Sequence, residues 1–179
     1  MEKYTVSPAP KANSFGAVYV LEPTAQHSHT AVPLHGRESS GEEFAEVLLE
    51  SKLAGQVTLA KKLAGWRLGF PSSLSSCGAL SLRRRCQPEA RSLTDVTARQ
   101  DLQMGRIRES VTYFMTVLDE EIDRLGGNAE NLILGGISQG GAIGMWTLLC
   151  SEDCGRRLGG FVGASSGFLS REHQGLISG

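Results

Sequence analysis

The stretch Leu132–Trp146, "LILGGISQGGAIGMW", decides the fold class that the sequence predicts. Its first apolar run ends at a turn of small residues around Ser138, and a second run with the composition of a helix follows. Gly136 and Gly140 stand two residues before and two residues after the serine, in the pattern G-x-S-x-G. This pattern is typical of a sharp turn that joins a buried strand to a helix and presents a serine above the end of a sheet.

The residue types around Ser138 suit a nucleophile. A nucleophilic serine at such a turn needs a strained backbone, and the two glycines let the strand and the helix approach closely. The unpaired N–H groups at the start of the following helix can stabilise a developing negative charge. We therefore predict that Ser138 is a nucleophile. A tight turn without chemistry stays open, because a chain with 22 glycines can match the pattern by chance.

Further apolar runs on both sides of this stretch predict the rest of the sheet and its helices. Each run is bounded by turn residues, and the predicted strands are 30–34, 66–70, 131–136 and 159–165. A helix is predicted from Ile107 to Leu125, where apolar residues recur every three or four positions, and Gly126 ends it. A second helix begins near Glu42 and carries Phe44, Val47 and Leu48 inward. Strands that alternate with helices indicate the α/β class, with a mostly parallel sheet covered by helices on both faces.

Composition narrows the function classes. The chain has 179 residues, 40% of them hydrophobic and 21% charged, with a net charge of −1, which predicts one globular domain and makes nucleic acid an unlikely partner. No apolar run has the roughly 18 residues that a membrane span needs, and no signal peptide is recognisable, so the expected location is the cytoplasm.

Cysteine and histidine usage predicts neither disulfides nor a metal site. The four cysteines, Cys77, Cys86, Cys150 and Cys154, lack paired C-x-x-C spacing and are interpreted as free thiols. His27, His29 and His35 have no acidic or sulfur ligand at a suitable spacing, so no metal or cofactor is expected. The segment 72–92 shows no helical or strand period, and we interpret its arginines as part of a solvated loop in preference to a basic docking patch.

A second motif, "LHGRESSGEEF" at 34–44, follows the first predicted strand. In α/β-hydrolases, the residue after the nucleophile and a loop after an early strand each donate a backbone N–H to the oxyanion. The candidates here are the N–H groups of Gln139 and Arg37. We expect His35 and Gly36 to shape the loop, with His35 a structural histidine at a strand end and not a catalytic base.

With these motifs, the sequence resembles the phospholipase/carboxylesterase family, particularly fungal acyl-protein thioesterases, over most of residues 29–169. The resemblance implies a cytosolic α/β-hydrolase without metal or cofactor. Such enzymes cleave thioesters or esters of long acyl chains, including palmitoyl groups on protein cysteines, so the implied substrate is an acylated protein or a lipid ester. It also assigns Ser138 as the nucleophile and the N–H groups of Arg37 and Gln139 as the oxyanion hole.

The sequence departs from this family in several places. The family's catalytic Asp and His positions lie beyond Gly179, which implies a single domain over 1–179 that lacks the last strands and is expected to self-associate through an exposed sheet edge. The alternative function is a catalytically impaired remnant or an acyl-binding interaction protein. Pro33 interrupts a predicted central strand, where proline is not expected. Glu38 stands at a usual glycine, and residues 77–88 can be written as an out-of-frame reading of the family's loop, a hypothesis that the transcript sequence tests.

Overall fold

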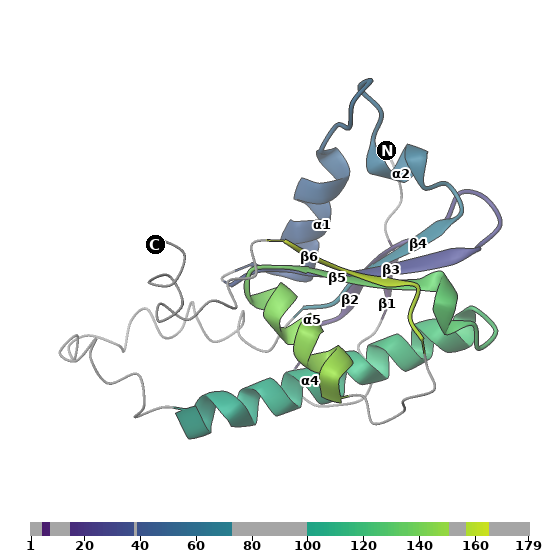
Figure 1. Cartoon of the computed structure of the whole chain (residues 1–179). Helices are drawn as coiled ribbons and strands as arrows, with labels where there is room; N and C mark the ends of the chain where they lie inside the picture. The colour runs from purple at the N-terminus through teal and green to yellow at the C-terminus, as the bar shows by residue number, and fades with distance from the viewer. Residues whose placement is uncertain (1–4, 8–14, 38, 73–99, 151–156, 165–179) are drawn as a thin grey trace, which may run out of the picture.

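The computed structural model describes residues 5–7, 15–37, 39–72, 100–150 and 157–164 (Figure 1). The elements in chain order are β1 (Thr5–Ser7), β2 (Val18–Leu21), β3 (His29–Leu34), α1 (Gly41–Glu50), α2 (Leu59–Lys62), β4 (Trp66–Phe70), α4 (Gln100–Arg124), a short 3₁₀ turn (Ala129–Asn131), β5 (Leu132–Ile137), α5 (Gln139–Cys150) and β6 (Gly160–Ala164). All four strands that the sequence predicts are present, and β1 and β2 are strands that it did not predict.

The described strands form one six-stranded sheet in the order β1-β2-β4-β3-β5-β6. The neighbours β4, β3, β5 and β6 run parallel, whereas β1 and β2 add an antiparallel pair beside β4. Helices α1 and α2 lie on one face of the sheet, and α4 and α5 lie on the other (Figure 1). The predicted α/β class, a mostly parallel sheet with helices on both faces, is confirmed.

Each face of the sheet carries its own apolar core. On the face towards α4, the alternating strand residues Val32, Leu34, Leu132 and Leu134 pack with the buried side of α4. On the face towards α1, Leu21, Leu68 and Phe70 pack with Ala45 and Leu49 of α1 and with Ala60 of α2. Successive strand residues therefore enter different cores, as expected of strands buried on both sides.

Helix α4 confirms the predicted helix and extends it to Gln100. Four of the six predicted inward residues, Val111, Phe114, Leu118 and Ile122, are buried, and Ile107 and Leu125 are half-buried. The predicted glycine end is also present. Gly126 and Gly127 both have positive φ, and their N–H groups donate to the carbonyls of Asp123 and Ile122, at 3.0 and 2.9 Å. These two bonds make a Schellman motif, which satisfies the last carbonyls of the helix.

Helix α1 begins as predicted, but the prediction that Val47 faces inward was wrong. Ser40 and Glu43 form a capping box at its start. The buried residues are Gly41, Ala45 and Leu49, whereas Val47 is 67% exposed. The contact of Gly41 with β4 sets the rotation of the helix, because a Cβ on Gly41 would lie 2.3 Å from the carbonyl oxygen of Phe70. A residue two positions beyond Ala45 then points to the opposite side of the helix.

Pro33 lies inside β3, between β4 and β5, which corrects the expectation that a central strand excludes it. The register with β4 runs only from His29 to Ala31, whereas the register with β5 continues to Leu34. One of the two ladders has therefore ended before Pro33. A proline is tolerated where a strand is paired on a single side, as at a sheet edge.

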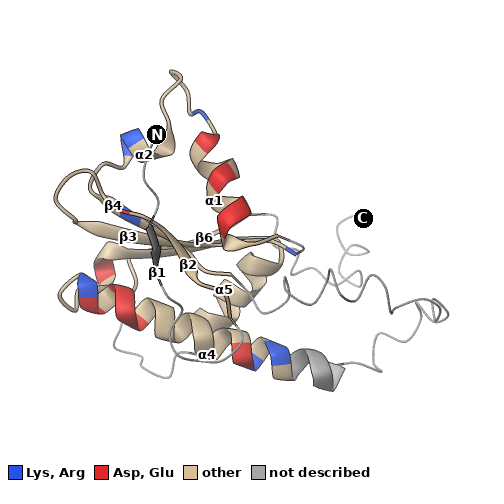
Figure 2. Ribbon diagram, turned by 180° about the vertical axis from the view of Figure 1, so that it is seen from behind, with Lys and Arg blue, Asp and Glu red and all other residues tan. Residues whose placement is uncertain are grey.

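A buried group of charges joins the sheet to α4. Arg67 is 5% exposed, and its Nε donates to both carboxylate oxygens of Glu121, at 3.1 and 2.9 Å. Its guanidinium also bonds Glu22, and Arg124 lies 3.4 Å from Glu121. Burial lowers the pKa of Arg67, but the hydrogen bonds and charges of Glu22 and Glu121 outweigh it and raise this pKa above its usual value. Figure 2 shows acidic and basic residues together on the last turns of α4.

Candidate active site around Ser138

Ser138 occupies the single residue between β5 and α5, at the carboxyl end of the parallel strands. Its φ is +52°, in the left-handed region that non-glycine residues rarely adopt, and the residue is exposed. Its N–H donates to the carbonyl of Ala164 at 2.9 Å, and its own carbonyl accepts from the N–H of Ala142 at 3.1 Å. Strand β6 and the first turn of α5 thus hold the serine in a strained backbone conformation.

The glycines on either side of Ser138 are packed too tightly for any side chain. A Cβ on Gly136 would lie 2.5 Å from the carbonyl carbon of Gly140. A Cβ on Gly140 would lie 2.4 Å from the carbonyl oxygen of His35 and 2.5 Å from that of Leu34. Both contacts are with backbone, which cannot give way as a flexible side chain can. The turn therefore depends on these two glycines, and Gly140 also ties it to the end of β3.

The loop after β3 passes directly against the serine turn. A Cβ on Gly36 would stand 3.6 Å from the carbonyl oxygen of Ile137 and 3.7 Å from the Cβ of Ser138, at ordinary van der Waals distance. His35 is 6% exposed, and its Nδ1 lies 2.7 Å from the carbonyl oxygen of Gly36. Because a carbonyl only accepts, Nδ1 carries the proton in this bond. This backbone contact is the structural role that the sequence predicted for His35.

The two candidate oxyanion donors lie on either side of this contact. Arg37 is the exposed turn residue that follows Gly36. Gln139 is the first residue of α5, so its N–H has no acceptor within the helix. The structure therefore brings together the Gly36 loop, Ser138 and the start of α5. It also shows a residue that sequence reasoning missed, Ala164, which anchors the N–H of Ser138 from a strand 26 positions later.

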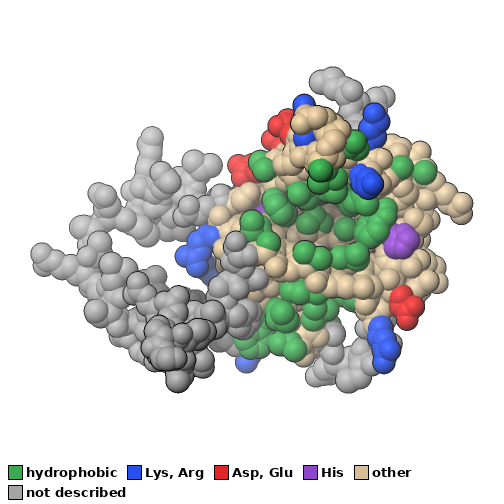
Figure 3. Space-filling model, turned by 45° about the horizontal axis from the view of Figure 1, so that its top comes forward, with side chains coloured by type: hydrophobic (Ala, Val, Ile, Leu, Met, Phe, Trp, Pro, Cys, Tyr) green, Lys and Arg blue, Asp and Glu red, His purple; other side chains and the backbone are tan. Residues whose placement is uncertain are grey.

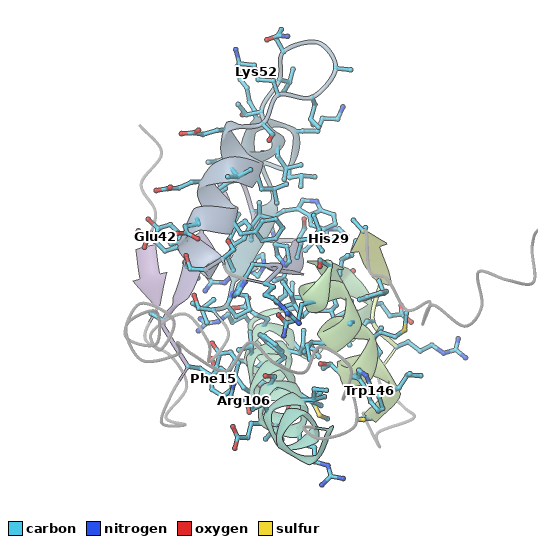
Figure 4. All side chains as sticks on the ribbon, turned by 90° about the vertical axis from the view of Figure 1, so that its left-hand side faces the viewer. Phe15, His29, Glu42, Lys52, Arg106 and Trp146 are labelled. Carbon is cyan, nitrogen blue, oxygen red and sulfur yellow. The ribbon has the colours of Figure 1, made fainter. Side chains whose placement is uncertain are left out.

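The other histidines have separate roles at the opposite end of β3. The Nε2 of His27 lies 3.0 Å from the hydroxyl of Thr30, and the Nδ1 of His29 lies 2.9 Å from that of Ser28. The ring of His29 also stacks on Trp66, with 4.7 Å between ring centroids. Figure 4 shows His29 among the strands, away from Trp146 on α5. Within the described ranges, no group of three or more His, Cys, Asp or Glu residues is placed to hold a metal ion.

Some predictions fall on other parts of the chain. Cys150 is an exposed free thiol, as predicted. The remaining cysteines, Glu38, the arginines between 83 and 91 and the segment 77–88 lie outside the described residues. In the part of the chain that the structure describes, no helix has both the length and the apolar character to cross a bilayer.

Comparison with known proteins finds relatives of the chain that share one description. The chain is 31% identical to Acyl-protein thioesterase 1 of Yarrowia lipolytica over 141 residues, which is 79% of this chain and 58% of that protein. It is 28% identical over 156 residues to Acyl-protein thioesterase 1 of Gibberella zeae, covering 86% and 63% of the two chains. Acyl-protein thioesterase 1 homolog 1 of Dictyostelium discoideum is 26% identical over 153 residues, covering 84% and 62%. The chain is therefore similar in sequence to three proteins named acyl-protein thioesterase.

The chain does not cover the whole length of these relatives. It spans 58–63% of the length of the curated relatives that it matches. No protein-family model matches the sequence. A solved structure described as Bacterial Heroin Esterase superposes with a TM-score of 0.48 at 14% identity, covering 89% of this chain and 43% of that one.

Proposed function

We propose that this chain carries the nucleophile and the oxyanion site of a hydrolase that cleaves acyl thioesters or carboxylic esters. The observation that carries the proposal is Ser138, held at φ +52° between two glycines and against the Gly36 loop. The relatives named acyl-protein thioesterase support an acylated protein as the substrate. A lipid ester offers the same reacting carbonyl, and the cytoplasm is the predicted location.

The reaction begins when the Oγ of Ser138 attacks the acyl carbonyl carbon. The carbonyl π electrons move to the oxygen, and the backbone N–H groups of Arg37 and Gln139 stabilise the resulting oxyanion. The intermediate collapses, the C–S or C–O bond breaks, and the thiol or alcohol leaves with the proton taken from the serine. Water then attacks the acyl-serine, which releases the carboxylic acid and restores Ser138. The family resemblance assigns the base that moves these protons, and its carboxylate partner, to positions beyond Gly179.

The backbone hydrogen bonds support Gln139 in preference to Ser138 as an oxyanion donor. The N–H of Ser138 already donates to the carbonyl of Ala164, so it is not available to an oxyanion. The N–H of Gln139 has no acceptor within α5, and it lies at the amino end of a 12-residue helix, where the helix dipole favours negative charge. The amino end of α5 therefore supplies a hydrogen-bond donor and an electrostatic field that stabilises negative charge.

A fluorophosphonate probe tests the proposal, because an activated serine displaces its fluoride and keeps the phosphonyl group. Because the resemblance assigns the base to positions beyond Gly179, we expect slow covalent labelling of the folded chain, supported by the oxyanion donors alone and mapped by peptide mass spectrometry to Ser138. Ser138→Ala removes the label. Ser51→Ala is the matched control, since Ser51 is exposed and its hydroxyl only donates to the carbonyl of Val47; labelling persists in that variant. A folded chain that takes up no label, or takes it up at another serine, contradicts the proposal.

Two substrates with the same acyl chain test whether both a thiol and an alcohol can act as the leaving group. A thioester and an oxygen ester of the same acyl chain are both expected to release acid, at rates that Ser138→Ala abolishes. Release of acid that survives Ser138→Ala contradicts the assignment of the nucleophile.

A further inference from the structure

Strand β6 contacts both sides of the serine turn. Before the serine, the carbonyl of Ala164 accepts the N–H of Ser138 at 2.9 Å. After the serine, the ring of Phe161 packs against α5 at Gly144, where an added Cβ would lie 2.9 Å from the Cε2 of the ring. The two contacts come from one strand, so β6 holds both the strand end and the helix that meet at Ser138.

Helix α5 meets the sheet through two buried glycines on one of its faces. Gly140 and Gly144 are four positions apart, so they lie one above the other on the helix. A Cβ on Gly140 would lie within 2.5 Å of the carbonyl oxygens of Leu34 and His35 at the end of β3. The contact at Gly144 is instead with the ring of Phe161. The helix is thus fixed by backbone at its first turn and by an aromatic side chain one turn later.

The position of α5 decides where the N–H of Gln139 points. In a trans peptide group, the C=O and the N–H point in opposite directions. The carbonyl of Ser138 points along the helix, because it accepts the N–H of Ala142 at 3.1 Å. The N–H of Gln139 belongs to the same peptide group and therefore points out of the amino end of α5. A shift or rotation of the helix moves this donor with it.

Phe161 and its neighbour Val162 point to opposite faces of the sheet. Phe161 is half-buried and packs with the core on the α4 side. Val162 is 62% exposed on the α1 side, where Figure 3 shows hydrophobic side chains gathered over the middle of the face. Of these two large residues of β6, Phe161 is therefore the one that supports α5.

We propose that Phe161 is a positioning residue, which holds α5 against β6 and so keeps the N–H of Gln139 aimed at the oxyanion. This inference rests on the proposed function, because the oxyanion forms when Ser138 attacks the acyl carbonyl. Phe161 itself touches no reacting atom. It acts through Gly144 and the first turn of α5, whose position sets the direction of the donor.

Two phenylalanine truncations separate positioning from stability. Phe161→Ala removes the ring that contacts α5, and we expect the rate of fluorophosphonate labelling at Ser138 to fall by about 10-fold, less than the roughly 100-fold of a displacement by 1 Å. Phe15→Ala is the matched control. Phe15 is also half-buried against the same core, but it stacks on Tyr113 of α4 and lies apart from Trp146 of α5 (Figure 4). The folded control keeps the wild-type rate, and an unchanged rate in Phe161→Ala or an equal fall in both variants overturns the proposal.

A pair of compensating size changes tests the same contact without emptying the core. Gly144→Ala places a methyl group against the Phe161 ring and is expected to slow labelling. Phe161→Leu shortens the side chain opposite, so the double variant Gly144→Ala/Phe161→Leu should label faster than Gly144→Ala alone. Such a rescue requires the two residues to act through one contact. A double variant that labels no faster than Gly144→Ala contradicts the proposal.

Amide hydrogen exchange provides a readout that does not depend on reactivity. In Phe161→Ala, we expect the amide of Ser138 to exchange faster relative to that of Leu134 in β5, because the turn loosens and its bond to Ala164 opens more often. In Phe15→Ala, this ratio of exchange rates should equal that of the wild type. A wild-type ratio in Phe161→Ala would rule the positioning role out. A wild-type chain that takes up no label contradicts the proposed function instead, and the exchange ratio still decides whether Phe161 holds the turn.

Discussion

The two ends of the parallel strands differ in burial, in charge and in backbone strain. At the carboxyl ends, Ser138 lies in an exposed, strained turn made possible by Gly136 and Gly140. At the amino ends, Arg67 and Glu121 are charged, buried and paired, and no strained backbone is involved. The first arrangement exposes a reactive group at a cost in stability, and the second satisfies charges inside the core. We expect substitutions at one end to change reactivity and those at the other to change stability.

The largest effect is expected at the ion pair. Arg67→Met leaves the buried carboxylate of Glu121 with only the more distant Arg124, and removing one partner of a buried pair lowers the free energy of unfolding by about 3–5 kcal/mol. The double variant Arg67→Met/Glu121→Leu should recover most of this loss, because the charges that lose a partner, Glu22 and Arg124, are about half exposed and not buried. Urea unfolding measures both. If the single and double variants lost the same free energy of unfolding, the ion pair itself would be the source of the stability.

The second-largest effect is expected on labelling at the carboxyl ends of the parallel strands. Gly140→Ala forces its Cβ against the carbonyl of His35 and separates the serine turn from the Gly36 loop. We expect the rate of fluorophosphonate labelling to fall by about 100-fold or more, as displacement by about 1 Å does in active sites. Gly105→Ala on α4 is the control, since a Cβ there meets nothing within 4 Å. Labelling at the wild-type rate in Gly140→Ala would show that the contact does not matter for reactivity.

The third effect is the loss of stability at alkaline pH, which tests the burial of Tyr113 in the core. Tyr113 is buried, stacks on Phe15 at 4.0 Å between centroids, and donates to the carbonyl of Gly16 at 3.4 Å. Burial raises the pKa of Tyr113 to about 12. Its contribution to stability is complete below the unfolded pKa of about 10 and is lost as pH rises towards 12, by about 1.4 kcal/mol for each unit.

Tyr113→Phe isolates this contribution. Unfolding free energies are compared for the two proteins between about pH 9 and pH 11, where the wild type should lose stability more steeply than the variant. Arg67 keeps its charge over this range because its pKa is raised, so the ion pair does not contribute to the difference. Parallel curves for the two proteins would show that Tyr113 ionises as freely in the folded state as in the unfolded state.

The smallest effect measures the strain at Ser138. Ser138→Gly should raise the free energy of unfolding by about 0.5–1 kcal/mol, since glycine adopts a positive φ without a steric cost. Gln56→Gly is the matched control, because Gln56 has φ +61° in an exposed turn. We expect both variants to gain stability and only Ser138→Gly to lose labelling. Loss of stability in Ser138→Gly would indicate that the serine side chain stabilises the turn.

Local patterns in the sequence were sufficient to predict one part of this molecule. Strands β3 to β6 and helix α4 follow from apolar runs and from their boundaries, and Gly136 and Gly140 follow from the space that a strand-to-helix turn requires. These features depend on neighbours within a few residues. The antiparallel strand β2 was missed, although its run of Val18 to Leu21 is apolar, because pairing with β4 depends on residues about 50 positions away.

Long-range contacts account for the other differences. The direction of Val47 depends on how Gly41 meets Phe70, and the partner of Arg67 is 54 positions away. The bond between the N–H of Ser138 and Ala164 depends on the register of β6, which no local pattern specifies. Sequence patterns were therefore sufficient to propose Ser138 as the nucleophile, whereas the structure was needed to show which contacts hold its backbone.

The rate and position of fluorophosphonate labelling in three proteins test the contrast between the two ends most directly. The proteins are the wild type, Gly140→Ala and Arg67→Met/Glu121→Leu, each first shown to be folded. The predicted result is labelling at Ser138 in the wild type, a fall of about 100-fold in Gly140→Ala, and a wild-type rate in the double variant. A rate that falls equally in both variants, or a label that maps elsewhere than Ser138, would contradict the account.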